Sequence, residues 1–192
     1  MFIRIKKHNR LEYAYVVMNV WTSKGTRQKS LKYLGRVFSL EKKGFDNKYY
    51  NEEHYKKLKN FEFKELIVEL VKKELIKLGF KTQNSKDLTL KYNDVVLNVD
   101  LENLSFKTSK GKNFVIRTNE GFICKETINN LMSMKPPIKE TEEEKRLATM
   151  KNLVKNVLEA GLKPDDRMFL LLYEKLNESW VKNEKIQNNK EV

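Results

Sequence analysis

The 192-residue sequence predicts an α+β protein built in three parts. β-branched and aromatic residues concentrate in the first 40 residues and again between residues 80 and 118, which is typical of strands. Apolar residues recur at helical spacing over residues 62–78 and again beyond residue 140. We therefore expect an N-terminal three-stranded antiparallel sheet, a central helix with a β-sheet core, and a C-terminal helical hairpin.

The N-terminal sheet is predicted from three strand-like runs separated by turn residues. The expected strands cover residues 2–7, 11–22 and 26–38, and Gly35 is expected to form a bulge or bend. Counting by twos along the second strand separates Ala14, Val16, Met18 and Val20 from Tyr13, Tyr15, Val17, Asn19 and Trp21. On the third strand it separates Arg27, Lys29, Leu31 and Tyr33 from Gln28, Ser30, Lys32, Leu34 and Arg36. Cations on both faces indicate an edge strand or one that is only partly covered.

The remaining elements follow from periodicity and from turn and capping signals. Expected helices cover residues 51–59, 62–78, 124–134, 141–159 and 164–181, and expected strands cover 80–82, 88–92, 95–100, 104–108 and 114–118. Thr141, followed three residues later by Glu144, reads as a capping box. We divide the chain into a basic β-sheet module (1–48), a central α/β core (49–135), a helical hairpin (138–182) and a frayed tail (183–192).

The positive charge is concentrated at one end of the chain. The formal net charge is +13, and residues 1–48 hold 12 Lys and Arg against 3 Asp and Glu, a net charge of +9. Residues 136–192 hold 11 of each, so the C-terminal helices are neutral overall. A Lys-rich genome would raise the lysine content everywhere, but it would not concentrate the excess. A local basic field attracts phosphate groups.

Other features bound the class of protein. Cys124 is the single cysteine, which excludes an intramolecular disulfide and a multi-cysteine metal site, and we expect it to be a buried small residue. Charge interrupts the N-terminus at once, unlike a signal peptide, and no apolar run reaches the ~18 residues of a membrane span. We expect a cytoplasmic protein with no membrane contact, no cofactor and no metal site.

The first forty residues carry the most specific pattern. They read MFIRIKK, then EYAYVVMNVW, then KGTRQKSLKYLGRV. This resembles the N-terminal module of DDE-type insertion-sequence transposases, and also the opening of small uncharacterised archaeal proteins that share the module. The matching positions are Gly25, Arg27, Gln28, Lys29, Leu34, Gly35 and Arg36. The resemblance implies DNA contact by these residues. It implies no strand transfer, because the three-acid catalytic domain of those enzymes is longer than this chain.

Physical chemistry selects the same segment for nucleic-acid contact. Cations here can meet phosphates, Gln28 can read an adenine edge, and exposed rings can stack on unpaired bases. The candidate contact residues are Arg4, Lys6, Tyr13, Tyr15, Trp21, Lys24, Arg27, Gln28, Lys29, Lys32 and Arg36. The competing interpretation is that Tyr13 and Tyr15 simply pack against the helix at 62–78.

The sequence therefore predicts non-catalytic nucleic-acid binding, with DNA favoured and RNA or ribosome association as the first alternative. A second alternative is a metal-dependent nuclease that uses acids of the central region, namely Glu65, Glu69, Asp94, Asp100 and Glu102. Against it, the strand at 114–118 lacks the acid-x-lysine pair expected in such cores. The apolar face of the last helix leaves a protein partner or self-association open.

Overall fold

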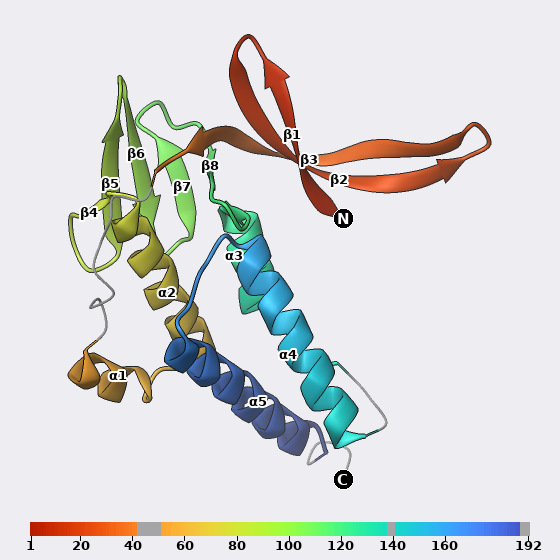
Figure 1. The fold of residues 1–192 in the computed structure, drawn as a ribbon, viewed down its shortest axis with the longest axis vertical. Coiled ribbons are helices and arrows are strands. Elements are labelled where there is room, and N and C mark those ends of the chain that lie inside the picture. Colours follow the sequence, from red (N-terminus) through yellow and green to blue (C-terminus); the bar gives the residue numbers. More distant parts are fainter. Residues whose placement is uncertain (42–50, 138–140, 189–192) are drawn as a thin grey trace.

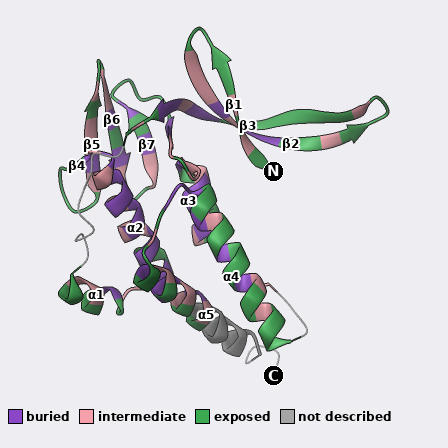
Figure 2. Ribbon diagram, in the orientation of Figure 1, coloured by how far each residue is buried: buried purple, intermediate pink, exposed green. Residues whose placement is uncertain are grey.

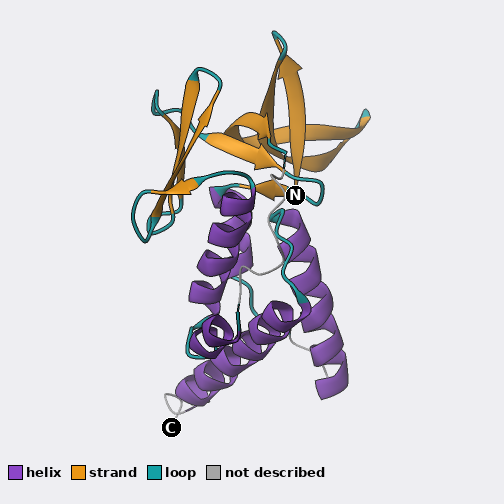
Figure 3. Ribbon diagram, turned by 60° about the vertical axis from the view of Figure 1, so that its left-hand side comes forward, coloured by secondary structure: helices purple, strands orange, loops and turns teal. Residues whose placement is uncertain are grey.

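The computed structural model describes residues 1–41, 51–137 and 141–188. Within these ranges the protein is α+β, with two β-sheets above a group of helices (Figure 3). Residues 42–48 of the predicted basic module and residues 189–192 of the predicted tail lie outside the described part of the chain. Among the described residues, no helix combines the length and apolar character needed to cross a membrane.

The first sheet contains the predicted N-terminal strands and two more. Its order is β1 (Phe2–His8), β2 (Leu11–Thr22), β3 (Gly25–Ser39), β8 (Phe114–Arg117) and β9 (Phe122–Ile123). β3 and β8 run parallel, and the other neighbours are antiparallel. The three-stranded antiparallel prediction is confirmed. The sheet also recruits strands from the central segment, so it extends beyond residues 1–48.

Two hairpin ends of this sheet diverge and project from the rest of the molecule (Figure 1). β1 pairs with the first half of β2, over residues 11–17, whereas β3 pairs with residues 13–22. The three strands therefore overlap only around residues 13–17. Beyond that overlap, residues 18–30 form a two-stranded ribbon, which we call the arm.

Gly35 marks the bend predicted in the third strand. Its φ of +137° is unfavourable for a side chain, and an added Cβ would lie 2.3 Å from the backbone oxygen of Asn113. The next residue, Arg36, donates its backbone N–H to that same oxygen at 3.2 Å. Gly35 thus lets β3 leave β2 and join β8 at close range.

The second sheet is an antiparallel meander in the order β4-β5-β6-β7. Its strands are β4 (Lys81–Thr82), β5 (Asp87–Tyr92), β6 (Val95–Asp100) and β7 (Ser105–Thr108), close to the predicted ranges. Two residues, Asn93 and Leu104, take positive φ angles at the turns of the meander. β9 was not predicted, because a two-residue strand carries no periodic signal.

The described helices occur where the sequence predicts them. They are α1 (Glu52–Leu58), α2 (Phe63–Lys77), α3 (Lys125–Met132), α4 (Glu142–Glu159) and α5 (Asp166–Asn188). The Thr141 side chain accepts a hydrogen bond from the Glu144 backbone N–H at 3.2 Å, as the capping signal predicts. The helical backbone of α5 extends to Asn188, seven residues past the predicted end and into the segment expected to fray.

The main core lies around α2, which is the most buried helix in Figure 2. Leu66, Ile67, Leu70, Val71 and Leu75 of this helix are all fully buried. They pack with the inner face of the second sheet and with apolar residues of α3, α4 and α5. α2 therefore connects the second sheet to the C-terminal helices.

The C-terminal helices pack differently from a simple hairpin. α4 lies mainly beside α3, and α5 lies mainly beside α2, so each helix covers a different part of the body. The core side chains Leu153 of α4 and Met168 of α5 are buried in the same cluster. α4 also leaves Leu147, Met150, Val154 and Leu158 at least 40% exposed, at helical spacing. Contact with a protein partner is predicted from the apolar face of the last helix, whose Met168, Leu172 and Leu176 lie in the core; contact through the C-terminal helices stays a prediction.

Candidate nucleic-acid interface

Strand register assigns each candidate side chain to a face of the first sheet, because paired residues project to the same side. Tyr15 pairs with Arg4 on one side and with Tyr33 on the other, and Tyr13 pairs with Lys6 and Arg36. We call this surface the tyrosine face. Its members are Arg4, Lys6, Tyr13, Tyr15, Tyr33 and Arg36, and it continues along the arm through Trp21 and Gln28.

Three tyrosine rings form a cluster on this face. The Tyr33 ring centroid lies 5.3 Å from that of Tyr15 and 6.3 Å from that of Tyr13, and both pairs are tilted. Lys6 Nζ lies 4.9 Å from the Tyr15 centroid and donates a hydrogen bond to Ser30 Oγ at 3.2 Å. The cluster is only half covered, since Tyr33 keeps 49% of its surface exposed. Partial burial, and secondarily the neighbouring Tyr13 and Tyr15, raise the pKa of Tyr33 above its usual value of 10.0.

The opposite face is apolar near the body and basic along the arm. Ala14, Val16, Leu34, Val37, Val115 and Cys124 form a small core there, with Ile3, Ile5 and Phe122 packed against it. Beyond this core, cations of β3 alternate on the same face with apolar residues of β2, since Arg27 pairs with Val20, Lys29 with Met18 and Lys32 with Val16. Lys32 forms an ion pair with Glu126 of α3 at 2.5 Å. The eleven predicted contact residues are thus split between two faces.

Period-two counting is wrong for the end of the third strand. Two irregularities interrupt the β2–β3 register, and Leu31 and Leu34 have no direct partner on β2. Tyr33 therefore shares a face with Tyr13 and Tyr15, while Lys32 lies on the opposite face. Tyr33 is absent from the eleven contact residues that the sequence predicts. A bulge signal at Gly35 was recognised, but the second irregularity carries no glycine that would reveal it.

Packing of Tyr13 and Tyr15 against α2, the competing interpretation, is wrong. Both rings lie beside Tyr33, Tyr15 also lies beside Lys6, and neither ring belongs to the core around α2. Phe38 of β3 is buried in the core around α2, where the two tyrosines were expected under that interpretation.

The arm is exposed on both faces. Trp21 is 83% exposed and Lys24 occupies the turn at its tip, while Arg27, Gln28 and Lys29 are all exposed. From residue 13 to residue 40 the chain contains five cations and no Asp or Glu. Over residues 25–35, β3 has a hydrogen-bonded strand on one side only. The prediction of a partly covered strand is confirmed for this segment, but cations on both of its faces are not found, because the irregularity at Leu31 places Lys32 on the same face as Arg27 and Lys29.

The acids of the central region are tied to local structure. Glu65 accepts the backbone N–H of Glu62 at the start of α2, and Asp100 accepts the backbone N–H groups of Glu102 and Asn103. Side-chain and then backbone hydrogen bonds from Asn103 lower the pKa of Asp100. Across the described residues, no three His, Cys, Asp or Glu side chains are grouped so that they could hold a metal ion.

Cys124 is buried, as predicted, and lies in the small core under the first sheet. Burial raises the pKa of its thiol, which keeps the sulfur uncharged.

Arg117 of β8 donates hydrogen bonds to Glu12 of β2 and to Ser39 of β3, so this cation is engaged within the first sheet.

Comparison with known proteins adds no family. No protein-family model, no curated protein and no solved structure matches the chain. A function for this protein therefore has to be inferred from its own residues.

Proposed function

We propose that the protein is a non-catalytic nucleic-acid-binding protein that holds duplex DNA through the arm and the adjoining tyrosine face. The observation that carries this proposal is the arm itself, a narrow ribbon without acids and exposed on both sides. The major groove of DNA is wide enough to admit a two-stranded β-ribbon.

The two sides of the arm carry different side chains, and each kind suits a ribbon that lies in a groove. Arg27 and Lys29 project from one side of the arm, Gln28 projects from the other, and Lys24 stands at the tip. When the Gln28 side faces the base edges in a groove, the long side chains of Arg27 and Lys29 on the other side can reach the phosphates. Arg4, Lys6 and Arg36 extend the positive surface along the tyrosine face, where they can meet the flanking backbone.

The test is a fluorescence-anisotropy titration with a labelled duplex at several salt concentrations. The Arg27→Ala/Lys29→Ala variant should bind at least about tenfold more weakly than the wild type, with a salt slope reduced by up to about 2, or ~0.9 for each lost phosphate contact. The matched control, Lys81→Ala/Lys91→Ala, removes the same charge from exposed positions of the second sheet and should bind like the wild type.

Two outcomes would overturn the proposal. One is the absence of binding to duplex DNA, single-stranded DNA and structured RNA at ~50 mM salt. The other is an equal loss of affinity in both double variants, which would mean that only total charge matters. A Mg²⁺-dependent cleavage assay, with Asp100→Ala beside the wild type, tests the nuclease alternative in the same preparation.

The tyrosine cluster favours a second candidate, binding of single strands or RNA. Half-exposed rings flanked by cations offer stacking surfaces for unpaired bases, each worth about 1 to 3 kcal/mol. Bases in a duplex are already stacked and cannot use these rings. A higher affinity for single-stranded DNA or RNA than for duplex of equal length, at the same salt concentration, would favour this candidate.

A further inference from the structure

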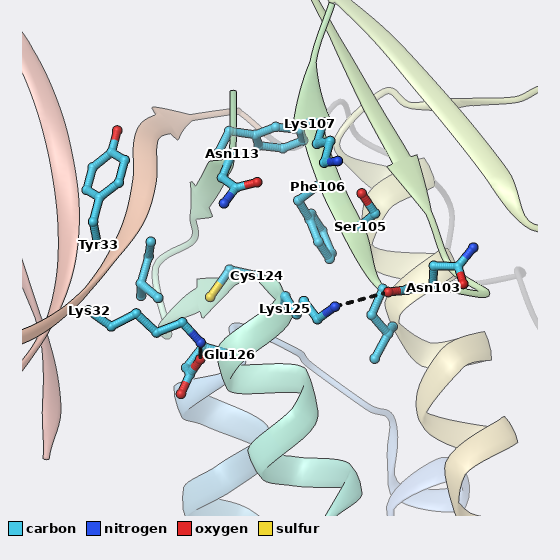
Figure 4. A pocket seen from close by; sticks show the side chains of 13 residues that line it. Lys32, Tyr33, Asn103, Ser105, Phe106, Lys107, Asn113, Cys124, Lys125 and Glu126 are labelled. Atoms are coloured by element: carbon cyan, nitrogen blue, oxygen red, sulfur yellow. Dashed lines mark hydrogen bonds and ion pairs between the residues drawn. The ribbon is translucent and has the colours of Figure 1, made fainter. Parts of the chain in front are cut away.

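A pocket lies where the two sheets meet the start of α3, separate from the arm (Figure 4). Its walls come from the unpaired edge of β3, from β7 and the turn before it, from the start of β8, and from the first turn of α3. Its volume of about 390 Å³ falls in the range of roughly 300 to 1,000 Å³ that is usual for small-molecule sites.

Three lysines from three distant segments line this pocket. They are Lys32 of β3, Lys107 of β7 and Lys125 of α3, and the only acid among the lining residues is Glu126. The lining side chains therefore carry a net charge of +2. Like charges gathered around one hollow repel each other, which is unfavourable for the empty protein and favourable once an anion binds.

Two of the three lysines have a partner within the pocket wall. Lys32 forms the ion pair with Glu126, and Lys125 Nζ donates to the backbone oxygen of Asn103 at 3.4 Å. Lys107 makes no ion pair with any residue that the structure describes. The first turn of α3 adds amide groups with partial positive charge on the same side.

Neutral groups complete the lining. Leu104 and the edges of the nearly buried Leu34, Phe106 and Phe114 form the apolar wall, and the side chains of Ser105 and Asn113 offer a hydroxyl and an amide (Figure 4). Within the described part of the chain, neither Ser105 nor Asn113 uses its side chain in a hydrogen bond. Such a mixture suits a ligand with a doubly charged anionic group and a planar, partly polar body.

We propose that this pocket binds the phosphate monoester of a nucleotide, with the base or sugar against the apolar wall. A phosphate monoester carries a charge of about −1.5 to −2 at pH 7, which matches the +2 of the lining. The ligand is either a free nucleoside monophosphate or the phosphorylated end of a strand. Binding here does not require the arm, so this inference stands apart from the proposed duplex contact.

The experiment is isothermal titration calorimetry of the whole protein with adenosine 5′-monophosphate and, separately, with adenosine, at ~50 mM salt. The monophosphate should bind and adenosine should not. Backbone NMR shifts on addition of the monophosphate should centre on Ser105, Lys107 and Asn113. A parallel titration with oligothymidylate, with and without a 5′-phosphate, separates the two sources. Tighter binding of the 5′-phosphorylated oligonucleotide than of the unphosphorylated one indicates that the pocket binds a strand end. Binding of the monophosphate without that preference indicates that it binds a free nucleotide.

Variants of opposite sign distinguish binding from folding. Lys107→Ala/Lys125→Ala should weaken monophosphate binding at least about tenfold, whereas Glu126→Gln should strengthen it about threefold, because it removes the one repelling charge. Lys110→Ala, in the exposed β7–β8 turn, is the control and should bind within about twofold of the wild type. Circular dichroism of each variant checks the fold.

Two results would overturn the inference. The first is that the protein prefers neither the monophosphate over adenosine nor the phosphorylated oligonucleotide over the unphosphorylated one. The second is that Glu126→Gln and the lysine variant change the affinity in the same direction. The Arg27→Ala/Lys29→Ala protein should retain monophosphate binding, so failure of the duplex proposal and failure of this one remain distinguishable.

Discussion

Both sheets contain antiparallel hairpins, but the charge is balanced in the second sheet and strongly positive along β2 and β3 of the first. Between residues 81 and 108, which span the second sheet, four Lys are balanced by four Asp and Glu, and Lys86 forms an ion pair with Glu102 at 2.5 Å. Between residues 13 and 40 there are five cations and no acids. An antiparallel sheet in this protein does not need a charge excess to fold. The excess on the first sheet is therefore the feature on which the proposed nucleic-acid contact rests.

The sheets also differ in what supports them. The second sheet is covered by α2 and buries a continuous apolar face, whereas the first has a small core of six buried side chains and two projecting hairpin ends. Stability should therefore depend on the helices and on the junction between the sheets, and binding should depend on the exposed first sheet.

The largest loss of stability is expected at Gly35, where β3 leaves β2 and joins β8. Gly35→Ala should lower the free energy of unfolding by about 3 to 4 kcal/mol, because the residue has φ +137° and its new Cβ would collide with the Asn113 backbone. Gly25→Ala is the matched control, since Gly25 also has a positive φ but nothing lies within 4 Å of its Cβ position. It should cost about 1 kcal/mol. Urea unfolding of both variants measures the difference, and equal losses would rule out the close approach.

The second-largest loss of stability is expected at Asp165, which connects α1, α2 and α5. Its carboxylate accepts hydrogen bonds from Tyr55 of α1 at 2.5 Å, from the nearly buried Lys73 of α2 at 2.9 Å, and from the backbone N–H of Met168 at 3.0 Å. Asp165→Ala should destabilise the protein by about 2 to 3 kcal/mol, a value reduced by the partial exposure of the carboxylate. Affinity for nucleic acid should not change while the protein is folded. Asp166→Ala, at the exposed neighbour, is the control.

The contribution of Asp165 should depend on pH. Partial burial acts to raise the pKa of this carboxyl, but the hydrogen bonds from Tyr55, Met168 and Lys73 outweigh it and lower the pKa below the usual 3.8. A lowered pKa in the folded state means that the stabilisation is present above that usual value and is lost as the pH falls through the folded pKa. The stability difference between the wild type and Asp165→Asn should therefore shrink below about pH 4. A difference that grows on acidification would contradict this assignment.

Much of this could be predicted from the sequence, and the rest could not for identifiable reasons. The strands at 2–22 and the helix around Leu70 follow from periodicity, which local residues determine. The parallel pairing of β3 with β8 joins residues about 80 positions apart, and no local pattern encodes it. Tyr33 reached the tyrosine face only through two register shifts. The pocket depends on Lys32, Lys107 and Lys125 meeting in space.

A smaller effect is expected at the tyrosine face. Tyr33→Ala should weaken binding of single-stranded DNA about fivefold to tenfold, consistent with the loss of one stacking ring. Binding of duplex DNA should fall by less than about twofold, because paired bases do not reach the ring. Tyr33→Phe keeps the ring and should behave like the wild type in both titrations. Equal losses of single-strand and duplex affinity in Tyr33→Ala would indicate a structural role for the cluster.

The smallest effect is expected on the second sheet, where charges are paired. Lys86→Ala removes an exposed ion pair with Glu102, and such pairs contribute about 0 to 1 kcal/mol, so the melting temperature should change little. Its affinity for duplex DNA should stay within about twofold of the wild type, whereas Lys29→Ala removes the same charge from the arm and should weaken binding more. Comparable losses in these two single variants would show that the sheets share one diffuse electrostatic surface. The contrast in local charge between the sheets would then have no bearing on where the ligand binds.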